Sequence, residues 1–400
     1  MKKNQYFNEN LYLINRINWF CKNKVNAFSP TISPAPKSVE RNEIESLYEA
    51  LKFYIDRGVN DIVVQKKYMG SYCDIYLNKT LNESYLVSRN GFKINHIDLE
   101  QAFESLIPLH QSMNWDNTEM YIIQSELMPW SVLGKGLIEN DYMSYLHAHS
   151  THFNYLSESP LYKKISDTMN SDMYKQYIDD SLNKSKSEFL ELYPKHVIRQ
   201  YEALRKFVIK DLKMYEQAIC VFKKQIEHFG KDEKIYFKPF NVLKVIYSDG
   251  SESILNDNHS YSMVNSDLYL SYHFKDIEDL NSKFEEINQW VTQLNDNNEE
   301  GVVVKPAKAF VANLPPGFKV RNNQYLTMIY GVDFHENYDY YFDRRKISKK
   351  IECSINDWMI NYELIKIKYS SINEENYLLK NLVFDRIQHE KIENQLDTRL

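Results

Sequence analysis

Apolar residues form short runs, or alternate with polar residues, between residues 60 and 130 and again between residues 234 and 321. Such runs predict β-strands. Asn90-Gly91, between "YLVSR" and "FKI", predicts the turn of an antiparallel hairpin. The other clear runs are "NDIVVQKK", "SYCDIYL", "TEMYIIQSELM", "KIYFKPFNVLKVIY", "GVVVKP" and "GFKVR".

Apolar residues instead recur every three or four positions over most of residues 141–233, which predicts long helices. The clearest example is "SEFLELYPKHVIRQYEALRKFVIKDLKMYEQAICVFKKQIEHFG", which ends at Gly230. The same spacing predicts a helix in "NEIESLYEALKFYIDRG", another near 275–295, and helical chain from about 340 onward. The proline-rich segment 28–41 is expected to be extended.

This order of elements predicts an α+β fold in which a β-rich domain is interrupted by helices. Residues 1–140 and 234–338 are expected to form the two parts of that domain. Residues 141–233 are then a helical insertion, and residues 339–400 a C-terminal helical module.

The bulk composition limits where the protein acts. The formal net charge of the 400 residues is −6, so any contact with nucleic acid must come from a local basic surface. The four cysteines include no C-x-x-C pair, and no apolar run reaches the roughly 18 residues that cross a bilayer. We therefore expect a cytoplasmic protein without a membrane partner.

The first candidate for chemistry is Lys67, in Lys67-Tyr68-Met69-Gly70, at the end of a buried strand. A lysine amine is a nucleophile only when it is neutral, which burial or neighbouring cations favour. A single K-x-x-G is a weak signal, because one chance match is expected among 10 glycines. Taken alone, it indicates a surface lysine at a strand end more often than a nucleophile.

Two later strands add charged residues at regular spacing. In "EEGVVVKP", alternation places Val303 and Lys305 on one face of a strand that follows Glu300. In "FKVR", Lys319 and Arg321 share a face, where two cations can hold phosphate oxygens, or can simply line a solvated edge.

The order of six motifs along the chain resembles that of the covalent nucleotidyltransferases. These motifs are K-x-x-G, S-R-x-G, a strand with a glutamate, an aromatic residue in "KPFNVL", E-G-V-V-V-K and K-x-R. The covalent nucleotidyltransferases include RNA ligases, DNA ligases and mRNA capping enzymes. The segments "KKYMGS", "SELMPWS", "KPFNVL", "EGVVVKP" and "FKVRNNQYLTMIYG" are more closely similar to the C-terminal ligase domain of bacterial polynucleotide kinase-phosphatase. The resemblance covers nearly the whole chain and implies antiparallel sheets of the ligase and capping-enzyme type.

The resemblance also implies a role for each matching residue. Lys67 would attack the α-phosphate of ATP and carry AMP. Arg89 would contact phosphate, Glu126 would face the ribose, and Phe240 would stack on adenine. The carboxylate near the Mg²⁺ or Mn²⁺ ion would be Glu300. The residues that would neutralise the α-phosphate are Lys305, Lys319 and Arg321.

By the same resemblance the chain is expected to be an ATP-dependent RNA ligase of bacterial RNA repair, acting on broken tRNA. AMP would pass to an RNA 5′-phosphate, and a 3′-hydroxyl would then attack that phosphate, seal the break and release AMP. No G-x-x-x-x-G-K-[ST] motif occurs, so a separate kinase-phosphatase subunit is expected to heal the ends. An RNA 3′-terminal 2′-O-methyltransferase is the other expected partner, with the helical insertion and C-terminal helices as candidate docking surfaces.

Three alternatives stay open at this point. A GTP-dependent capping enzyme shares the lysine chemistry, although it normally ends in an oligonucleotide-binding barrel rather than helices. A DNA ligase shares the first step, and an assembly subunit could retain the fold without turnover. The chain also departs from the resembling family at Tyr68 and Tyr72, where histidine and arginine are common, so contacts of those two residues are not carried over.

Overall fold

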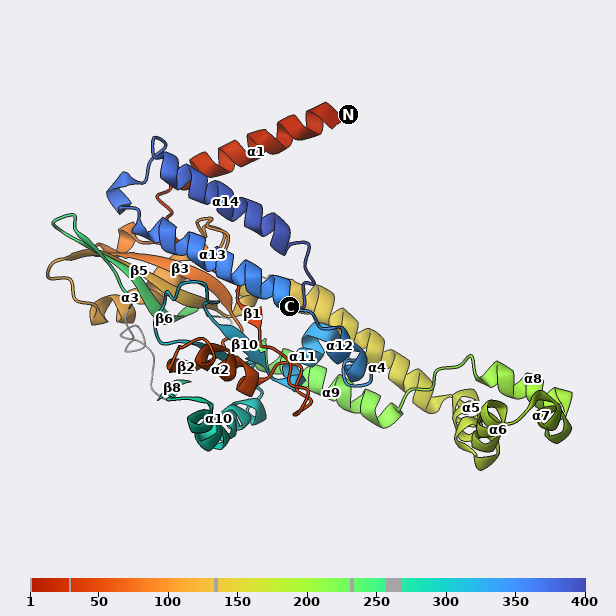
Figure 1. The fold of residues 1–400 in the computed structure, drawn as a ribbon. Helices are drawn as coiled ribbons and strands as arrows, with labels where there is room; N and C mark the ends of the chain where they lie inside the picture. The colour runs from red at the N-terminus through yellow and green to blue at the C-terminus, as the bar shows by residue number, and fades with distance from the viewer. Residues whose placement is uncertain (1, 29, 133–135, 231–233, 257–267) are drawn as a thin grey trace.

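The computed structural model describes residues 2–400 except 29, 133–135, 231–233 and 257–267 (Figure 1). Its body contains two five-stranded sheets, which confirms the α+β prediction. Neighbouring strands are antiparallel except β1 and β10, which are parallel. The first sheet has the order β1 (Ser33–Pro34), β10 (Phe318–Arg321), β9 (Gly301–Pro306), β2 (Asp61–Lys66), β8 (Tyr269–His273). The second has the order β4 (Tyr85–Ser88), β3 (Ser71–Asn78), β5 (Thr118–Met128), β6 (Tyr236–Tyr247), β7 (Glu252–Ile254).

The first sheet packs one face against α2 (Leu47–Ile55) and α10 (Ile277–Asp296), two helices that the apolar spacing predicted. Val302 and Val304 of β9 are buried in that apolar core. Because side chains alternate along a strand, Val303 and Lys305 point to the opposite face. The alternation predicted for "GVVVKP" is therefore confirmed, and this second face is free to form a site.

Helices cover both faces of the second sheet, and two of them were not predicted. Cys73, Ile75 and Leu77 of β3 pack toward α3 (Leu99–Ser112). The opposite face packs against α1 (Lys2–Lys22), α13 (Ser348–Lys366) and α14 (Tyr377–Glu393). Polar residues interrupt the apolar positions of α1, and Pro108 lies inside α3, so neither segment shows a clear helical pattern.

The turn at Asn90-Gly91 does not connect a regular hairpin. β4 pairs with β3, and only an isolated bridge, Val87 to Lys93, joins the two sides of the turn within the described residues. Gly91 has a φ of 79°, and a Cβ there would lie 2.3 Å from the Phe20 ring. Glycine is therefore required by both the backbone conformation and the close approach of α1.

The helical insertion extends away from the body (Figure 1). α4 (Met143–Glu158) and α9 (Leu212–Phe229) pack side by side, and a distal arm, which we define as residues 160–204, lies beyond them. The predicted long helix is broken at Pro194 and between residues 205 and 211. The arm consists of α5 (Pro160–Asn170), α6 (Asp172–Asn183), α7 (Lys186–Leu192) and α8 (Lys195–Leu204). The expected end of the insertion, residue 233, lies outside the described residues.

After β10 the chain forms α11 (Asn323–Tyr330) and α12 (Tyr338–Arg344) before it enters α13. α13 and α14 lie across the second sheet (Figure 1). The helices of 339–400 thus share a core with the strands. Among the described helices, none is both long and apolar enough to cross a membrane.

Candidate active site

A cavity of about 120 Å³ lies between the two sheets. The first sheet contributes Gln65 of β2 with Val303 and Lys305 of β9. Lys67 follows β2 directly and also lines the cavity. The residues that the second sheet contributes are Tyr72, Gln124, Glu126, Phe240 and Asn241. The cavity therefore collects four of the predicted site residues from strands that are distant in sequence.

Lys67 is fixed at the junction of β2 and β9. Its backbone N–H donates to the carbonyl of Gly301 at 2.9 Å, and its Nζ lies 2.7 Å from Glu300 Oε1. The Glu300 side chain is buried, whereas the Lys67 side chain is 23% exposed. Gly301 has a φ of 139°, and a Cβ there would lie 2.1 Å from the Val320 carbonyl oxygen. The glycine thus permits the strand pairing that brings Lys67 and Glu300 together.

Gly70, the glycine of the K-x-x-G motif, is required for packing. A Cβ at Gly70 would lie 2.4 Å from Glu126 Cγ and 2.8 Å from the Leu127 carbonyl oxygen. The chain can therefore turn from β2 into β3 directly against β5. Burial raises the pKa of Glu126 to about 7, partly offset by the charge of Lys67.

Phe240 and Lys305 face each other across the cavity. Lys305 Nζ lies 5.0 Å from the centroid of the Phe240 ring. Burial lowers the pKa of Lys305 to about 7, because desolvation disfavours the charged amine. An aromatic face beside a cation suits a planar base attached to a phosphate group.

Lys319 lies close to this cavity, whereas the Arg321 side chain is occupied elsewhere. Lys319 pairs across the sheet with Val303, and burial together with Arg321 lowers its pKa well below the usual value. The Arg321 guanidinium donates to both carboxylate oxygens of Glu45 and to the Arg399 carbonyl. The Nε and Nη2 donors of Arg321 are therefore already bound to these acceptors. The expected contact of Arg321 with phosphate stays a prediction.

Arg89 also lies apart from the cavity. Its guanidinium donates to Thr31 Oγ1 at 2.8 Å and to Glu393 Oε1 at 2.6 Å. Lys350 Nζ contacts the same Glu393 oxygen at 2.8 Å. Although burial acts in the opposite direction, Arg89 and Lys350 lower the pKa of Glu393 to about 2. Arg89 could therefore contact a phosphate only if its guanidinium released the Glu393 carboxylate of α14.

The sequence interpretation missed a polar chain in the wall of the cavity. Tyr72 Oη donates to Asp74 Oδ1 at 2.7 Å and accepts from Gln124 Nε2 at 2.8 Å. Asn241 Nδ2 donates to Gln124 Oε1 at 2.7 Å. The alternation of Gln124 with Glu126 places both on one face of β5, and this was the available signal.

The donor set also fits a divalent cation held mainly by a substrate. Glu300 Oε2 is buried and has no hydrogen-bond partner of normal geometry among the described residues. A carboxylate oxygen is a ligand that Mg²⁺ and Mn²⁺ accept. The described residues contain no group of three or more acidic, histidine or cysteine side chains arranged for a metal. Glu300 with substrate phosphates is therefore the combination that fits.

Two sheets that enclose a cavity, with a lysine at its edge and half-buried lysines in and beside its wall, define a nucleotidyl-transferring enzyme of the ligase type. The sequence matches the family described as "PNKP adenylyltransferase domain, ligase domain" over residues 22–375, and the chain belongs to this family. This confirms the resemblance seen in the motifs. A comparison with curated proteins gave no match.

Two solved structures are similar over nearly the whole chain. A chain from "Structure of the Pnkp1/Rnl/Hen1 RNA repair complex" is 54% identical, with a TM-score of 0.91, and the match covers 98% of this chain and 99% of that one. A chain from "Structure of Pnkp1/Rnl/Hen1 complex" is 53% identical, with a TM-score of 0.89, and the match covers 98% and 100%.

Proposed function

We propose that this protein is an ATP-dependent RNA ligase that adenylylates itself on Lys67. It then transfers AMP to an RNA 5′-phosphate and joins that end to a 3′-hydroxyl. The observation that carries the proposal is the position of Lys67 Nζ, at the edge of the cavity between the sheets and 2.7 Å from Glu300. The membership of an adenylyltransferase family supports the nucleotide chemistry.

In the first step, the Lys67 amine forms a bond to the α-phosphorus of ATP. The bond from that phosphorus to the bridging oxygen breaks, pyrophosphate leaves with the electron pair, and the amine loses its proton. Lys305 and Lys319 stabilise the negative charge that develops on the α-phosphate. Both lysines are half-buried, and this partial loss of water strengthens the effect, because their charges are screened less.

Glu126 and Phe240 recognise the nucleoside in this proposal. Phe240 offers a ring face to adenine, and Glu126 offers a carboxyl group to a ribose hydroxyl. Since the pKa of Glu126 is raised to about 7, it can donate or accept a hydrogen bond near neutral pH. Glu300 would hold Mg²⁺ or Mn²⁺, which when bound neutralises phosphate charge.

The partners follow from the similar structures, whose titles name an RNA repair complex of three proteins, Pnkp1, Rnl and Hen1. We propose that this chain is the ligase of such a complex. A separate kinase-phosphatase subunit would prepare the broken ends, and a methyltransferase would modify the 3′-terminal ribose. Broken tRNA stays the expected substrate.

The test is self-labelling with α-labelled ATP in the presence of Mg²⁺ or Mn²⁺. Wild type is expected to retain label after denaturation, and Lys67→Ala is expected to fall to background. Lys283→Ala is the matched control, because Lys283 Nζ lies 2.8 Å from Asp279 Oδ2 in a comparable ion pair that does not line the cavity. This control should keep most of its label.

Three results would contradict the proposal. Label on the Lys67→Ala protein would move the nucleophile elsewhere. Labelling by α-labelled GTP in place of ATP would indicate a capping-type enzyme. A wild-type protein that takes no label, alone or with its partner subunits, would indicate an assembly subunit.

A further inference from the structure

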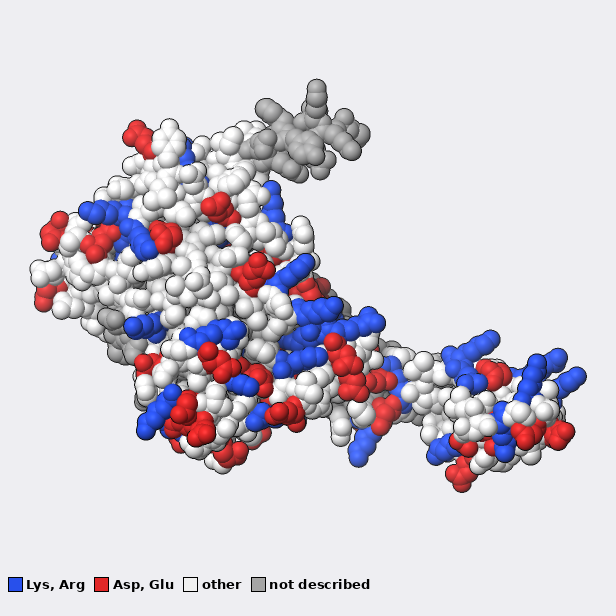
Figure 2. All heavy atoms as spheres, viewed as in Figure 1, with Lys and Arg blue, Asp and Glu red and all other residues white. Residues whose placement is uncertain are grey.

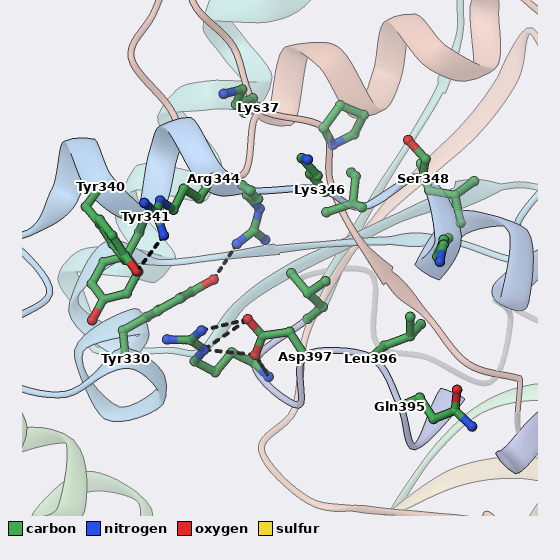
Figure 3. A pocket seen from close by; sticks show the side chains of 17 residues that line it. Lys37, Tyr330, Tyr340, Tyr341, Arg344, Lys346, Ser348, Gln395, Leu396 and Asp397 are labelled. Carbon is green, nitrogen blue, oxygen red and sulfur yellow. Dashed lines mark hydrogen bonds and ion pairs between the residues drawn. The ribbon is translucent and has the colours of Figure 1, made fainter. Parts of the chain in front are cut away.

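A second, larger cavity of about 920 Å³ opens near α12, away from Lys67 (Figure 3). It lies between the segment 344–349, the end of the chain and Lys37. Its lining is strongly basic, and the space-filling view shows Lys and Arg side chains gathered over this region (Figure 2). The lining cations are Lys37, Arg344, Arg345, Lys346, Lys349 and Arg399.

Few of these positive charges are neutralised. Of the described residues that line this basic cavity, the only acidic side chain is Asp397, and it pairs with Arg399. Arg345 shares the Glu45 carboxylate with a second guanidinium. The side chains of Lys346 and Lys349 are exposed and form no hydrogen bond or ion pair with any described residue. Four of the six cations are thus without a carboxylate partner.

This cluster of positive charge contrasts with the chain as a whole, whose formal net charge is −6. Cations that gather without carboxylates repel one another, and a polyanion removes that repulsion. The cavity also presents aromatic rings beside the cations. Tyr340 is 54% exposed, and Arg344 lies 4.5 Å from its ring centroid (Figure 3). Cations interleaved with exposed rings are typical of sites for single-stranded nucleic acid.

The basic cavity is coupled to the active site through buried contacts. Glu45 accepts from Arg345 of the cavity and from Arg321 of β10. Arg321 pairs across the sheet with Gly301, whose carbonyl accepts the backbone N–H of Lys67. One carboxylate and one strand pair therefore separate the two cavities.

We propose that this basic cavity binds the backbone phosphates of the single-stranded RNA whose end is joined at Lys67. Lys346 and Lys349 contact phosphate, and Tyr340 stacks on a base. The inference rests on the proposed ligase function, since it names where that reaction holds its RNA. It assigns to the helical C-terminal part a role in substrate binding.

The test compares the full-length Lys346→Ala/Lys349→Ala protein with a matched double variant, Lys79→Ala/Lys368→Ala. Both control lysines are exposed and make no side-chain contact with a described residue, so charge changes equally. Binding of a dye-labelled, 5′-phosphorylated single-stranded RNA is measured by anisotropy across a salt series. The cavity variant is expected to bind roughly tenfold more weakly near 0.1 M salt, with the logarithmic salt slope reduced by about 1.4. The control is expected to match wild type.

A second variant tests stacking without changing charge. Tyr340→Ala is expected to weaken RNA binding roughly fivefold or more, with an unchanged salt slope. Self-labelling with α-labelled ATP is expected to be normal in every variant, because none of these residues lines the cavity beside Lys67.

RNA affinity and salt slope equal to wild type in the cavity variant would overturn the inference. If that variant instead lost association with a kinase-phosphatase or methyltransferase subunit, the cavity would be a protein interface. Failure of the two proposals is distinguishable. A wild type that takes no label but binds RNA through Lys346 and Lys349 would refute the ligase function alone.

Discussion

At the scale of single residues, Asp74 is a buried carboxylate near the active site that is poorly solvated. Tyr72 donates to its Oδ1, whereas its Oδ2 has no hydrogen-bond partner in the described structure. Burial raises the pKa of Asp74 to about 7, well above its ordinary value of 3.8. The ionised carboxylate of Asp74 therefore destabilises the folded protein at alkaline pH.

We predict that Asp74→Asn stabilises the protein above pH 7. The folded state keeps a proton on Asp74 that the unfolded chain releases, so wild-type stability falls as pH rises from about 4 to about 7. Asparagine avoids this loss and still accepts the bond from Tyr72. The free energy of unfolding, measured in urea at pH 8, should rise by at most about 4 kcal/mol. The gain should disappear as pH approaches 4.

Asp249→Asn is the control for loss of a negative charge. Asp249 is exposed, and hydrogen bonds from Ser251 lower its pKa, so this variant should gain no stability at pH 8. If Asp74→Asn proved less stable than wild type at pH 8, Asp74 would be a well-solvated carboxylate in the native protein.

The residues of the site were predictable as a set, but their contacts were not. Lys67, Glu126, Phe240 and Lys305 line one cavity. The contact of Arg89 with Glu393 joins residues 304 positions apart, and the contact of Arg321 with Glu45 joins residues 276 apart. Alternation along a strand predicts the face on which a side chain lies. It carries no information on which distant carboxylate meets it.

At the scale of elements, the junction of β2, β3 and β5 depends on Gly70. We predict that Gly70→Ala reduces self-labelling by on the order of a hundredfold, because the new Cβ would displace Glu126 and the loop that carries Lys67. The Leu127 carbonyl is backbone and cannot rotate away, so stability should also fall by about 1–3 kcal/mol. Initial labelling rates and urea unfolding measure the two effects.

Gly250→Ala separates positioning from general destabilisation. Gly250 has a φ of 80° in the turn after β6, and its Cβ would meet no atom within 4 Å. This variant should lose about 1 kcal/mol through backbone strain and keep a normal labelling rate. Equal labelling by the two variants would show that Gly70 does not position the site.

The strands and most helices followed from periodicity because each buries one face. "GVVVKP" alternates between the core under α2 and the cavity, and α2 begins at the N-cap Ser46. α1 and α3 were not predicted, and each has its own physical reason. Pro108 lies inside α3. α1 contributes few buried residues, such as Phe20 and Cys21, to a core built mostly by other segments, so its own pattern is weak. Sequence spacing detects a helix only when that helix carries a complete apolar stripe.

At the scale of the whole molecule, the distal arm is a separate packing unit on a stalk (Figure 1). Its core consists of arm residues alone, including Tyr174, Tyr177 and Tyr201. The arm and the segment that follows it also expose large apolar side chains. These include Leu161, Met173, Leu182, Leu190, Leu192, Phe207 and Val208. A ligase body that acts alone gains nothing from such a surface, whereas assembly with a partner subunit would bury it.

We predict that the arm can be removed without loss of self-labelling. The Tyr162 hydroxyl accepts a hydrogen bond from the backbone N–H of Lys210 and donates one to its carbonyl. Tyr162, near the start of the arm, therefore lies close to Lys210, which follows the arm. A short Gly-Ser linker that replaces residues 163–209 should close the gap. The deleted protein should label at the wild-type rate, because the cavity between the sheets is intact.

The same deletion should abolish association with the partner subunits of the proposed repair complex, measured by size-exclusion chromatography of the co-expressed proteins. Phe207→Ser/Val208→Ser tests this without a deletion, since these side chains are 53% and 85% exposed and their loss leaves the arm core in place. It should weaken the complex and leave labelling unchanged. A deletion protein that still assembles would place the docking surface on α13, α14 or the body. One that assembles but no longer labels would show that the deleted residues support the catalytic fold itself.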